Sequence, residues 1–258
     1  YKTILFMKYY FQQPIKNPIK YYNNFQKQWK QSVFWAKKIN EKNNKLLNFK
    51  ARPEMESFNE KYINQGRIAK ILVNNYFISV ANLVNKILQK QSIFNSLEIG
   101  CGEGFSTKRL NDLLPINIDF EASEYVSKQI IEAQKRNPFL KIIEENVYKL
   151  KRNDNSIDLI FLLEVLEHLD YPELALKEIN RVSSENGYLI IGVPREPLWR
   201  ILNMSRFKYI KNFGNTPGHL NHWSTKRIIK LVEQNYGSVV AFETPLPWTI
   251  ILAKSKKN

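Results

Sequence analysis

Glycine and cysteine are both scarce in this sequence of 258 residues, which holds nine glycines and one cysteine. A single cysteine cannot form a disulfide within the chain, which favours a reducing compartment, so we expect a cytoplasmic protein. The apolar run at residues 3–7 is too short for a signal peptide and lacks a small-residue cleavage site. We find no apolar stretch long enough to cross a bilayer, so we expect a soluble protein without a transmembrane segment.

Acidic residues are nearly absent from the first 52 residues, which hold 12 Lys or Arg and one acid, Glu41. The remaining chain is close to balanced, with 27 basic and 23 acidic side chains. We therefore divide the sequence into a basic, aromatic-rich extension over 1–52 and one domain over 53–258. Aromatic rings interleaved with lysine can stack on bases or sit at a membrane surface, which makes the extension a candidate contact for nucleic acid or membrane. Alternatively, the basic and aromatic content of this extension reflects only the composition of the chain, because Lys, Asn, Ile and Tyr are abundant along its whole length.

Three of the nine glycines, Gly100, Gly102 and Gly104, stand at alternate positions directly after an apolar run that contains Glu98. The pattern predicts a buried strand, a loop without side chains and then a helix, so that a ligand can touch the backbone. A dinucleotide-binding loop needs its third glycine at position 105, where this chain has Phe, which disfavours nicotinamide and flavin cofactors. A carboxylate two residues before the first glycine would repel a pyrophosphate and suits a cationic, amine-bearing ligand.

The run from 97 to 104 resembles motif I of the class I methyltransferases that use S-adenosylmethionine (SAM), and the run from 155 to 194 is similar to the type 11 and type 23 methyltransferase families. The resemblance implies a Rossmann-like α/β fold with helices on both faces of a seven-stranded, mostly parallel sheet whose last strand is antiparallel. It also implies SAM as the cofactor and methyl transfer as the activity. The loop residues that would bind SAM are Glu98, Gly100, Cys101, Gly102 and Gly104.

Glu121 is the expected ribose contact. The strand-like run over 115–120 ends at Glu121, 21 residues after Gly100, close to the interval of about 20 residues at which an acid reaches a ribose in this topology. We therefore expect Glu121 to accept bonds from both ribose hydroxyls. The alternative is a helix capped by Ser123 whose first turn is negative.

Asn146 and Val147 end a third predicted strand over 139–147, and by the resemblance this end holds the adenine. The family more often has Asp where this chain has Asn146, but an amide oxygen can still accept a bond from an amine. For Cys101 we favour a small residue filling space behind the loop over a nucleophile, because no partner base is indicated.

The candidate catalytic residues follow the fourth predicted strand, a near-continuous apolar run over 157–163. Carboxyl ends of strands face the ligand crevice in an open α/β sheet, which places Glu164, Glu167 and His168 there. Methyl transfer needs a positioned acceptor and, for a hydroxyl, removal of its proton. We take His168 as the candidate base, together with Glu164.

Two alternatives exist for these residues. A metal site could use Glu164, Glu167 and His168 with a further histidine at 219 or 222, because the Glu-x-x-Glu-His run resembles that of the Hen-type small-RNA 2′-O-methyltransferases. Alternatively, Glu167 and His168 only cap and orient the next helix. We predict no metal, because relatives with the same run mostly lack an ion.

Segments around this unit complete the domain. Residues 68–88 are apolar at helical spacing and predict a helix on the sheet, by position a cover over SAM. Residues 195–223 hold Gly and Pro that break regular structure, which predicts a lid or acceptor-binding insertion. A helix after Ser224 or Thr225 and two strands over 238–243 and 248–253 follow.

The expected acceptor is a hydroxyl of a small molecule, a lipid precursor or a sugar, because the domain is nearly neutral and the predicted lid is rich in aromatic residues. One alternative is an RNA methyltransferase that grips RNA through residues 1–52. The other is a non-catalytic SAM-binding module.

Overall fold

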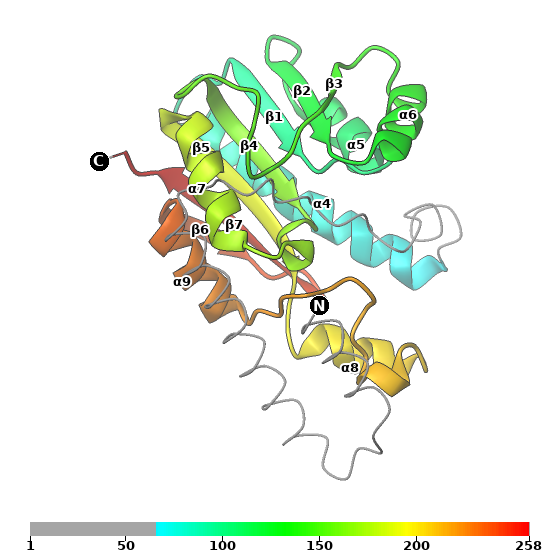
Figure 1. Cartoon of the computed structure of the whole chain (residues 1–258). Coiled ribbons are helices and arrows are strands. Elements are labelled where there is room, and N and C mark those ends of the chain that lie inside the picture. The colour runs from blue at the N-terminus through cyan, green and yellow to red at the C-terminus, as the bar shows by residue number, and fades with distance from the viewer. Residues whose placement is uncertain (1–65, 258) are drawn as a thin grey trace, which may run out of the picture. The chain divides into compact units, whose positions relative to one another are not determined.

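The computed structural model describes residues 66–257, so the extension over 1–52 lies outside the described residues. Seven strands of the described chain form one sheet in the order β3-β2-β1-β4-β5-β7-β6 (Figure 1). β7 is antiparallel to β5 and β6, and the other neighbouring pairs are parallel, as the sequence predicts. The strands are β1 Asn95–Ile99, β2 Asp119–Glu124, β3 Ile142–Glu144, β4 Ile157–Leu163, β5 Ser183–Pro194, β6 Gly237–Glu243 and β7 Trp248–Ser255.

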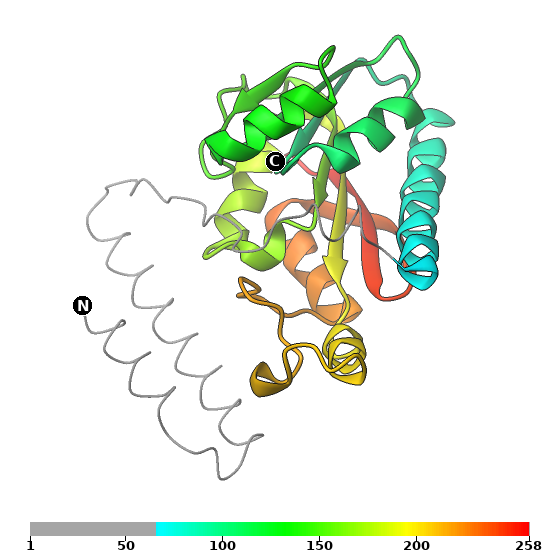
Figure 2. The ribbon, with the colours of Figure 1, turned by 90° about the vertical axis from the view of Figure 1, so that its right-hand side faces the viewer.

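Helices cover both faces of the sheet (Figures 1 and 2). Side chains alternate between the faces of a strand, so Phe161 of β4 packs in the core with α4 and α5, while Ile160 and Leu162 pack with α7 and α9. A strand buried on both faces requires the continuous apolar run that predicts it. The helices are α4 Arg67–Leu88, α5 Phe105–Leu113, α6 Ser127–Arg136, α7 Pro172–Val182, α8 Leu198–Ser205 and α9 Thr225–Asn235, with short 3₁₀ helices η1 Leu166–His168 and η2 Ile210–Asn212.

Helix α4 is the predicted helix over 68–88 and buries one face on the sheet. Within residues 66–257 it alone has the length and composition to cross a membrane, which corrects the expectation that no apolar stretch is long enough. Its Tyr76 lies over Gly192 of β5, where a Cβ atom would overlap the Tyr76 hydroxyl. A glycine in the middle of this strand is therefore explained by the close approach of α4.

Several predicted boundaries are wrong. β2 continues to Glu124, three residues past the predicted end at Glu121, because its parallel pairing with β1 continues through Ser123. Ser123 therefore lies in a strand, donates its hydroxyl to the Glu98 carbonyl at 3.3 Å, and does not cap α6. β3 covers only 142–144 of the predicted 139–147.

Candidate functional site

The glycine loop, α4 and the end of β4 enclose a hollow that is open to solvent. All three glycines of the loop have left-handed backbones, with φ of 75°, 54° and 79° at Gly100, Gly102 and Gly104. Residues with side chains adopt this conformation only at a cost, which accounts for glycine at alternate positions. The hollow is lined by Tyr76, Phe77, Gly100, Cys101, Gly102, Glu103, Phe105, Ser106, Leu163 and Glu164.

Glu98 lies buried behind this loop, with 1% of its surface exposed. Its Oε2 accepts a hydrogen bond of 2.6 Å from the Thr107 hydroxyl, whereas its Oε1 is buried without a hydrogen-bond partner among the described residues. Burial raises the pKa of Glu98 to about 7, and the neighbouring Ser106 and Thr107 hydroxyls oppose this rise. An unsatisfied buried carboxylate oxygen beside a backbone loop fits a ligand that carries an ammonium group.

Glu124, not Glu121, contacts the glycine loop. Glu124 ends β2, and its Oε2 accepts a 2.9 Å hydrogen bond from the Gly102 amide. Its Oε1 accepts bonds from the next two backbone amides, at Tyr125 and Val126. The carboxylate is thus fixed at the loop by three backbone donors.

The Glu121 side chain belongs to a different part of the structure. It forms ion pairs with Lys141 and Arg152, and Arg152 is also paired with buried Glu145 at 3.0 Å. Burial alone would raise the pKa of Glu121, but the hydrogen bonds and charges of Arg152 and Lys141 hold it below its usual range. The structure therefore does not bring the Glu121 carboxylate to the glycine loop, where the Glu124 carboxylate lies instead.

Asn146 and Val147 lie in the turn after β3, and neither lines the hollow. The Asn146 side-chain oxygen accepts a 2.9 Å bond from the Tyr148 amide, and Val147 is buried. The preceding residue, Glu145, donates its amide to the Glu124 carbonyl at 3.0 Å. The turn is thus held beside the end of β2.

Cys101 lines the hollow from within the glycine loop and is 4% exposed. Burial, together with the nearby Glu98 and Glu124 charges, raises the pKa of its thiol. Only a thiolate is an effective nucleophile, so these surroundings favour the space-filling role.

Glu164 is the first residue after β4 and lines the hollow opposite the glycine loop. Its amide donates to the Gly192 carbonyl at 2.9 Å. Its φ of 58° is in the left-handed region, which is uncommon for a residue other than glycine and occurs often at functional sites. The backbone thus holds Glu164 at the rim of the candidate cofactor site.

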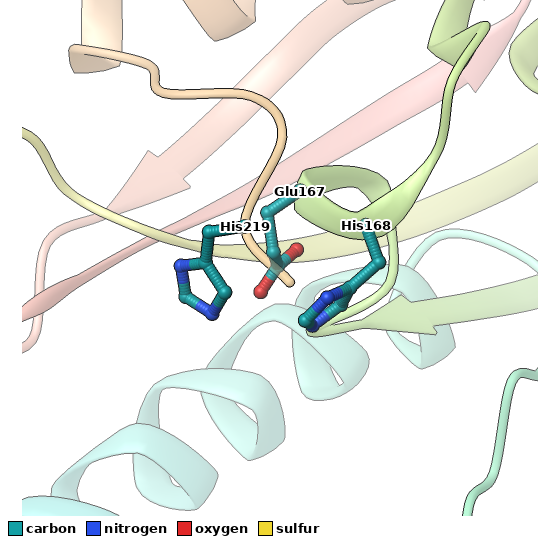
Figure 3. A group of neighbouring side chains, drawn as sticks. All are labelled: Glu167, His168 and His219. Carbon is teal, nitrogen blue, oxygen red and sulfur yellow. The ribbon is translucent and has the colours of Figure 1, made fainter. Parts of the chain in front are cut away.

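Glu167, His168 and His219 form a second group (Figure 3). Glu167 and His168 belong to η1, and His219 comes from the loop after η2. One potential ligand atom of each lies within 4.8 Å of the others, and the two imidazole rings meet edge to face with centroids 4.9 Å apart. The structure thus selects His219 over His222, whose Nδ1 lies 3.4 Å from a Glu196 carboxylate oxygen.

The loop that carries His219 also sets the orientation of His168. The Nδ1 atom of His168 lies 3.2 Å from the Gly218 carbonyl oxygen. A carbonyl can only accept, so Nδ1 carries the hydrogen, and in a neutral ring Nε2 holds the lone pair. His168 therefore presents Nε2 as the atom that can take a proton or coordinate an ion.

The predicted lid over 195–223 contains α8 and η2 and rests on η1. The amides of Leu220 and Asn221 both donate to the Glu167 carbonyl, at 2.7 and 3.0 Å. The Asn221 side chain donates to the Leu169 carbonyl at 2.7 Å. These bonds connect the insertion to the residues that follow β4.

Sequence reasoning missed several residues of the site. Tyr76 and Phe77 line the hollow, whereas the expectation that their helix covers the cofactor names no individual residue. The sequence patterns also assign no ligand role to Glu124 or to Thr107, which donates to Glu98. A signal for Glu124 does exist, because Phe120 and Ala122 continue the alternation of a buried strand past Glu121.

Comparison with known proteins agrees with this geometry. Residues 97–191 match the profile of the type 11 family, described as a methyltransferase domain. An uncharacterized methyltransferase of Schizosaccharomyces pombe is 32% identical over 103 residues, 36% of this chain and 37% of that protein. The mitochondrial ubiquinone biosynthesis O-methyltransferase of Dictyostelium discoideum is 27% identical over 143 residues, 50% of this chain and 44% of that protein.

A solved SAM-dependent methyltransferase of Aquifex aeolicus has the same fold, with a TM-score of 0.52 at 17% identity over 66% of this chain and 88% of that one. The chain spans between 5% and 48% of the length of seven curated relatives that it matches. The family match covers the glycine loop, the end of β2 and the residues after β4. Residues 97–191 of this chain therefore match a methyltransferase domain, and these comparisons imply SAM as its cofactor.

Proposed function

We propose that this chain transfers the methyl group of SAM to a hydroxyl of a small molecule, a lipid precursor or a sugar. The observation that carries the proposal is the arrangement of two neighbouring sites, a glycine loop with buried Glu98 and a group with the oriented imidazole of His168. The Dictyostelium relative is named an O-methyltransferase, which supports oxygen as the accepting atom.

The residues around the glycine loop fit SAM. Glu98 offers its unsatisfied Oε1 to the ammonium group. Glu124 has used three of the roughly four acceptor positions of a carboxylate, which leaves one for a ribose hydroxyl. Asn146 and Val147 remain our proposed adenine contacts. When bound, SAM supplies a methyl group activated by its sulfonium sulfur.

His168 is our candidate for removing the acceptor's proton. Methyl transfer to a hydroxyl releases this proton, and a base of suitable geometry assists the step. Nε2 of His168 holds the lone pair, because Nδ1 is directed at the Gly218 carbonyl. Glu164 lies at the rim of the hollow, where we propose that it helps to position the acceptor.

A bound divalent cation is the second candidate for assisting this step. The observation that favours it is the convergence of Glu167, His168 and His219, whose potential ligand atoms lie within 4.8 Å of one another. A carboxylate and two imidazoles are ligands for zinc and other transition metals, and such an ion would make a coordinated hydroxyl more acidic.

Direct ion binding separates the two candidates. We would titrate the EDTA-treated full chain with Zn²⁺ and with Mn²⁺ by calorimetry. We would compare His219→Ala with His222→Ala, because the Nδ1 atom of His222 lies 3.4 Å from a Glu196 carboxylate oxygen and His222 is not part of the group. Loss of ion binding in His219→Ala alone, with methyl transfer lost after EDTA and restored by the ion, supports the cation. If methyl transfer is complete after EDTA treatment and is abolished by His168→Ala, the result supports His168 as the base.

The proposed reaction is tested by incubating the full chain with methyl-labelled SAM and separated extracts of hydroxylated metabolites, lipids and RNA. We expect label in an O-methylated small molecule or lipid, and none with Gly102→Val, in which a branched side chain would occupy a left-handed loop position. Label confined to RNA, with a steep salt dependence, would instead support the RNA alternative. SAM binding without transfer to any fraction would support the non-catalytic module.

A further inference from the structure

The segment over 201–213, which we name the lid tip, exposes an unusual number of large apolar side chains. It includes most of α8 and all of η2 and lies beyond the end of β5 (Figures 1 and 2). Phe207 is 84% exposed. Single exposed apolar residues are ordinary, but five within 13 residues indicate a surface that meets a partner. The five are Ile201, Met204, Phe207, Ile210 and Phe213.

The charge of this region has one sign. Between Glu196 and Glu233 the sequence has no acidic residue and seven Lys or Arg. Three of these, Arg206, Lys208 and Lys211, are exposed within the lid tip itself, between the apolar side chains. An anionic partner is therefore favoured over a neutral or cationic one.

Hydrogen bonds at the base of the lid tip hold its apolar side chains outward. The buried Asn203 side chain donates to the Gly214 carbonyl at 2.9 Å and to the Thr216 hydroxyl at 3.2 Å. The Lys208 amide donates to the Asn203 carbonyl, and the Gly214 amide to the Tyr209 carbonyl, both at 2.9 Å. These hydrogen bonds therefore fix the backbone conformation in which the apolar side chains of the lid tip are exposed.

We propose that the lid tip docks on the surface of a bilayer that contains anionic lipid. Aliphatic side chains such as Ile201, Met204 and Ile210 gain from contact with the acyl region, and neighbouring lysines attract anionic headgroups. RNA fits less well, because only two of the five exposed apolar side chains, Phe207 and Phe213, offer a flat ring on which a base can stack.

This docking gives the proposed methyl transfer a lipid precursor as its acceptor, so it rests on the proposed function. The segment that forms the lid tip continues directly into the loop that carries His219. An acceptor held in the bilayer at the tip would therefore meet the segment that also carries His219.

Vesicle binding of the full chain tests the docking. We would measure co-sedimentation with phosphatidylcholine vesicles alone and with about one third phosphatidylglycerol. Two variants alter the tip, Phe207→Ser/Ile210→Ser and Lys208→Glu/Lys211→Glu. The matched control is Ile116→Ser/Phe139→Ser, which removes an exposed isoleucine and an exposed phenylalanine elsewhere on the domain.

We expect the full chain to bind the anionic vesicles, each tip variant to lower the partition coefficient at least about tenfold, and the control to leave it unchanged. All variants should keep their SAM affinity, which shows that the domain is folded. The unchanged extension over 1–52 is present in every variant, so a difference reports the tip.

Equal vesicle binding by wild type and tip variants would overturn the docking proposal, as would loss of RNA binding in the tip variants without loss of vesicle binding. Methyl transfer to a soluble acceptor is measured on the same proteins. If the protein transfers methyl groups but does not bind vesicles, only the docking proposal is overturned. If it binds vesicles but transfers no methyl group, only the proposed function is contradicted.

Discussion

Replacement of Glu98 by Gln should stabilise the ligand-free protein and weaken SAM binding. Glutamine has nearly the same shape and can still accept the hydrogen bond from Thr107, but it never carries a charge. Ionised Glu98 is buried without full compensation, which is costly in the absence of a cation. The same negative charge is what we expect the ammonium group of SAM to contact.

The magnitude follows from the pKa of Glu98, which burial raises from 4.5 to about 7. Below pH 4.5 the acid is protonated in both the folded and unfolded chains and contributes no difference. As pH rises from 4.5 to 7, the unfolded chain loses this proton first, so the free energy of unfolding falls by about 1.4 kcal/mol per pH unit. Above about pH 7 the loss is complete, at roughly 3 kcal/mol.

Urea denaturation followed by tryptophan fluorescence, without SAM, measures this effect at pH 5 and pH 8.5. At pH 8.5 we expect the free energy of unfolding of Glu98→Gln to exceed that of wild type by about 1 to 3 kcal/mol. The lower value allows for a glutamine amide hydrogen that is buried without an acceptor. At pH 5, half a unit above 4.5, wild type has lost only about 0.7 kcal/mol, so the difference should be smaller than at pH 8.5 by roughly 2 kcal/mol. Glu233→Gln, on the exposed side of α9, is the control and should follow wild type. The reasoning is refuted if wild type and Glu98→Gln lose stability in parallel as pH rises.

Three further predictions concern the glycine loop and α4. Calorimetry should show that Glu124→Gln weakens SAM binding by roughly 1.5 to 3 kcal/mol, whereas Glu121→Gln changes it by less than about 0.5 kcal/mol; the reverse order would restore the ribose assignment to Glu121. Gly102→Val should abolish SAM binding, because its backbone has φ of 54°, and wild type should not bind NADH; retained affinity in the variant would place the ligand elsewhere. Gly192→Ala should lower the free energy of unfolding by about 1 to 3 kcal/mol, because its Cβ would overlap the Tyr76 hydroxyl, and Tyr76→Phe should restore part of this loss; no loss in thermal denaturation would contradict the packing.

The sequence predicts best the elements whose signal is local. β4 has its predicted bounds because a strand buried on both faces is a continuous apolar run. α4 differs by one residue at its start, because the apolar spacing of a helix that packs on a sheet is equally clear. The end of β2 is missed because Glu121 is a charged residue inside a strand. Its partners, Lys141 and Arg152, come from distant parts of the sequence.

In the site, too, the residues that are close in sequence are predicted better than those that come from distant segments. The glycine loop and Glu98 are contiguous in sequence, and their spacing is enough to locate them. Whether His219 or His222 approaches His168 depends on the path of a loop that is about 50 residues away in sequence. No local sequence pattern predicts this path. The lid is expected from its Gly and Pro content, but α8 within it has only two turns and gives a weak periodic signal.

The hydrogen bonds between the segment over 195–223 and η1 keep His219 beside Glu167 and His168. Glu167 and His168 are fixed after β4, whereas His219 reaches them only while Leu220 and Asn221 stay bonded to the Glu167 carbonyl. Opening of this segment to admit an acceptor would carry His219 away and release Nδ1 of His168 from Gly218. The group is therefore complete only while the segment over 195–223 stays bonded to η1, and any movement of this segment would change both the ligand set of the group and the orientation of the His168 ring.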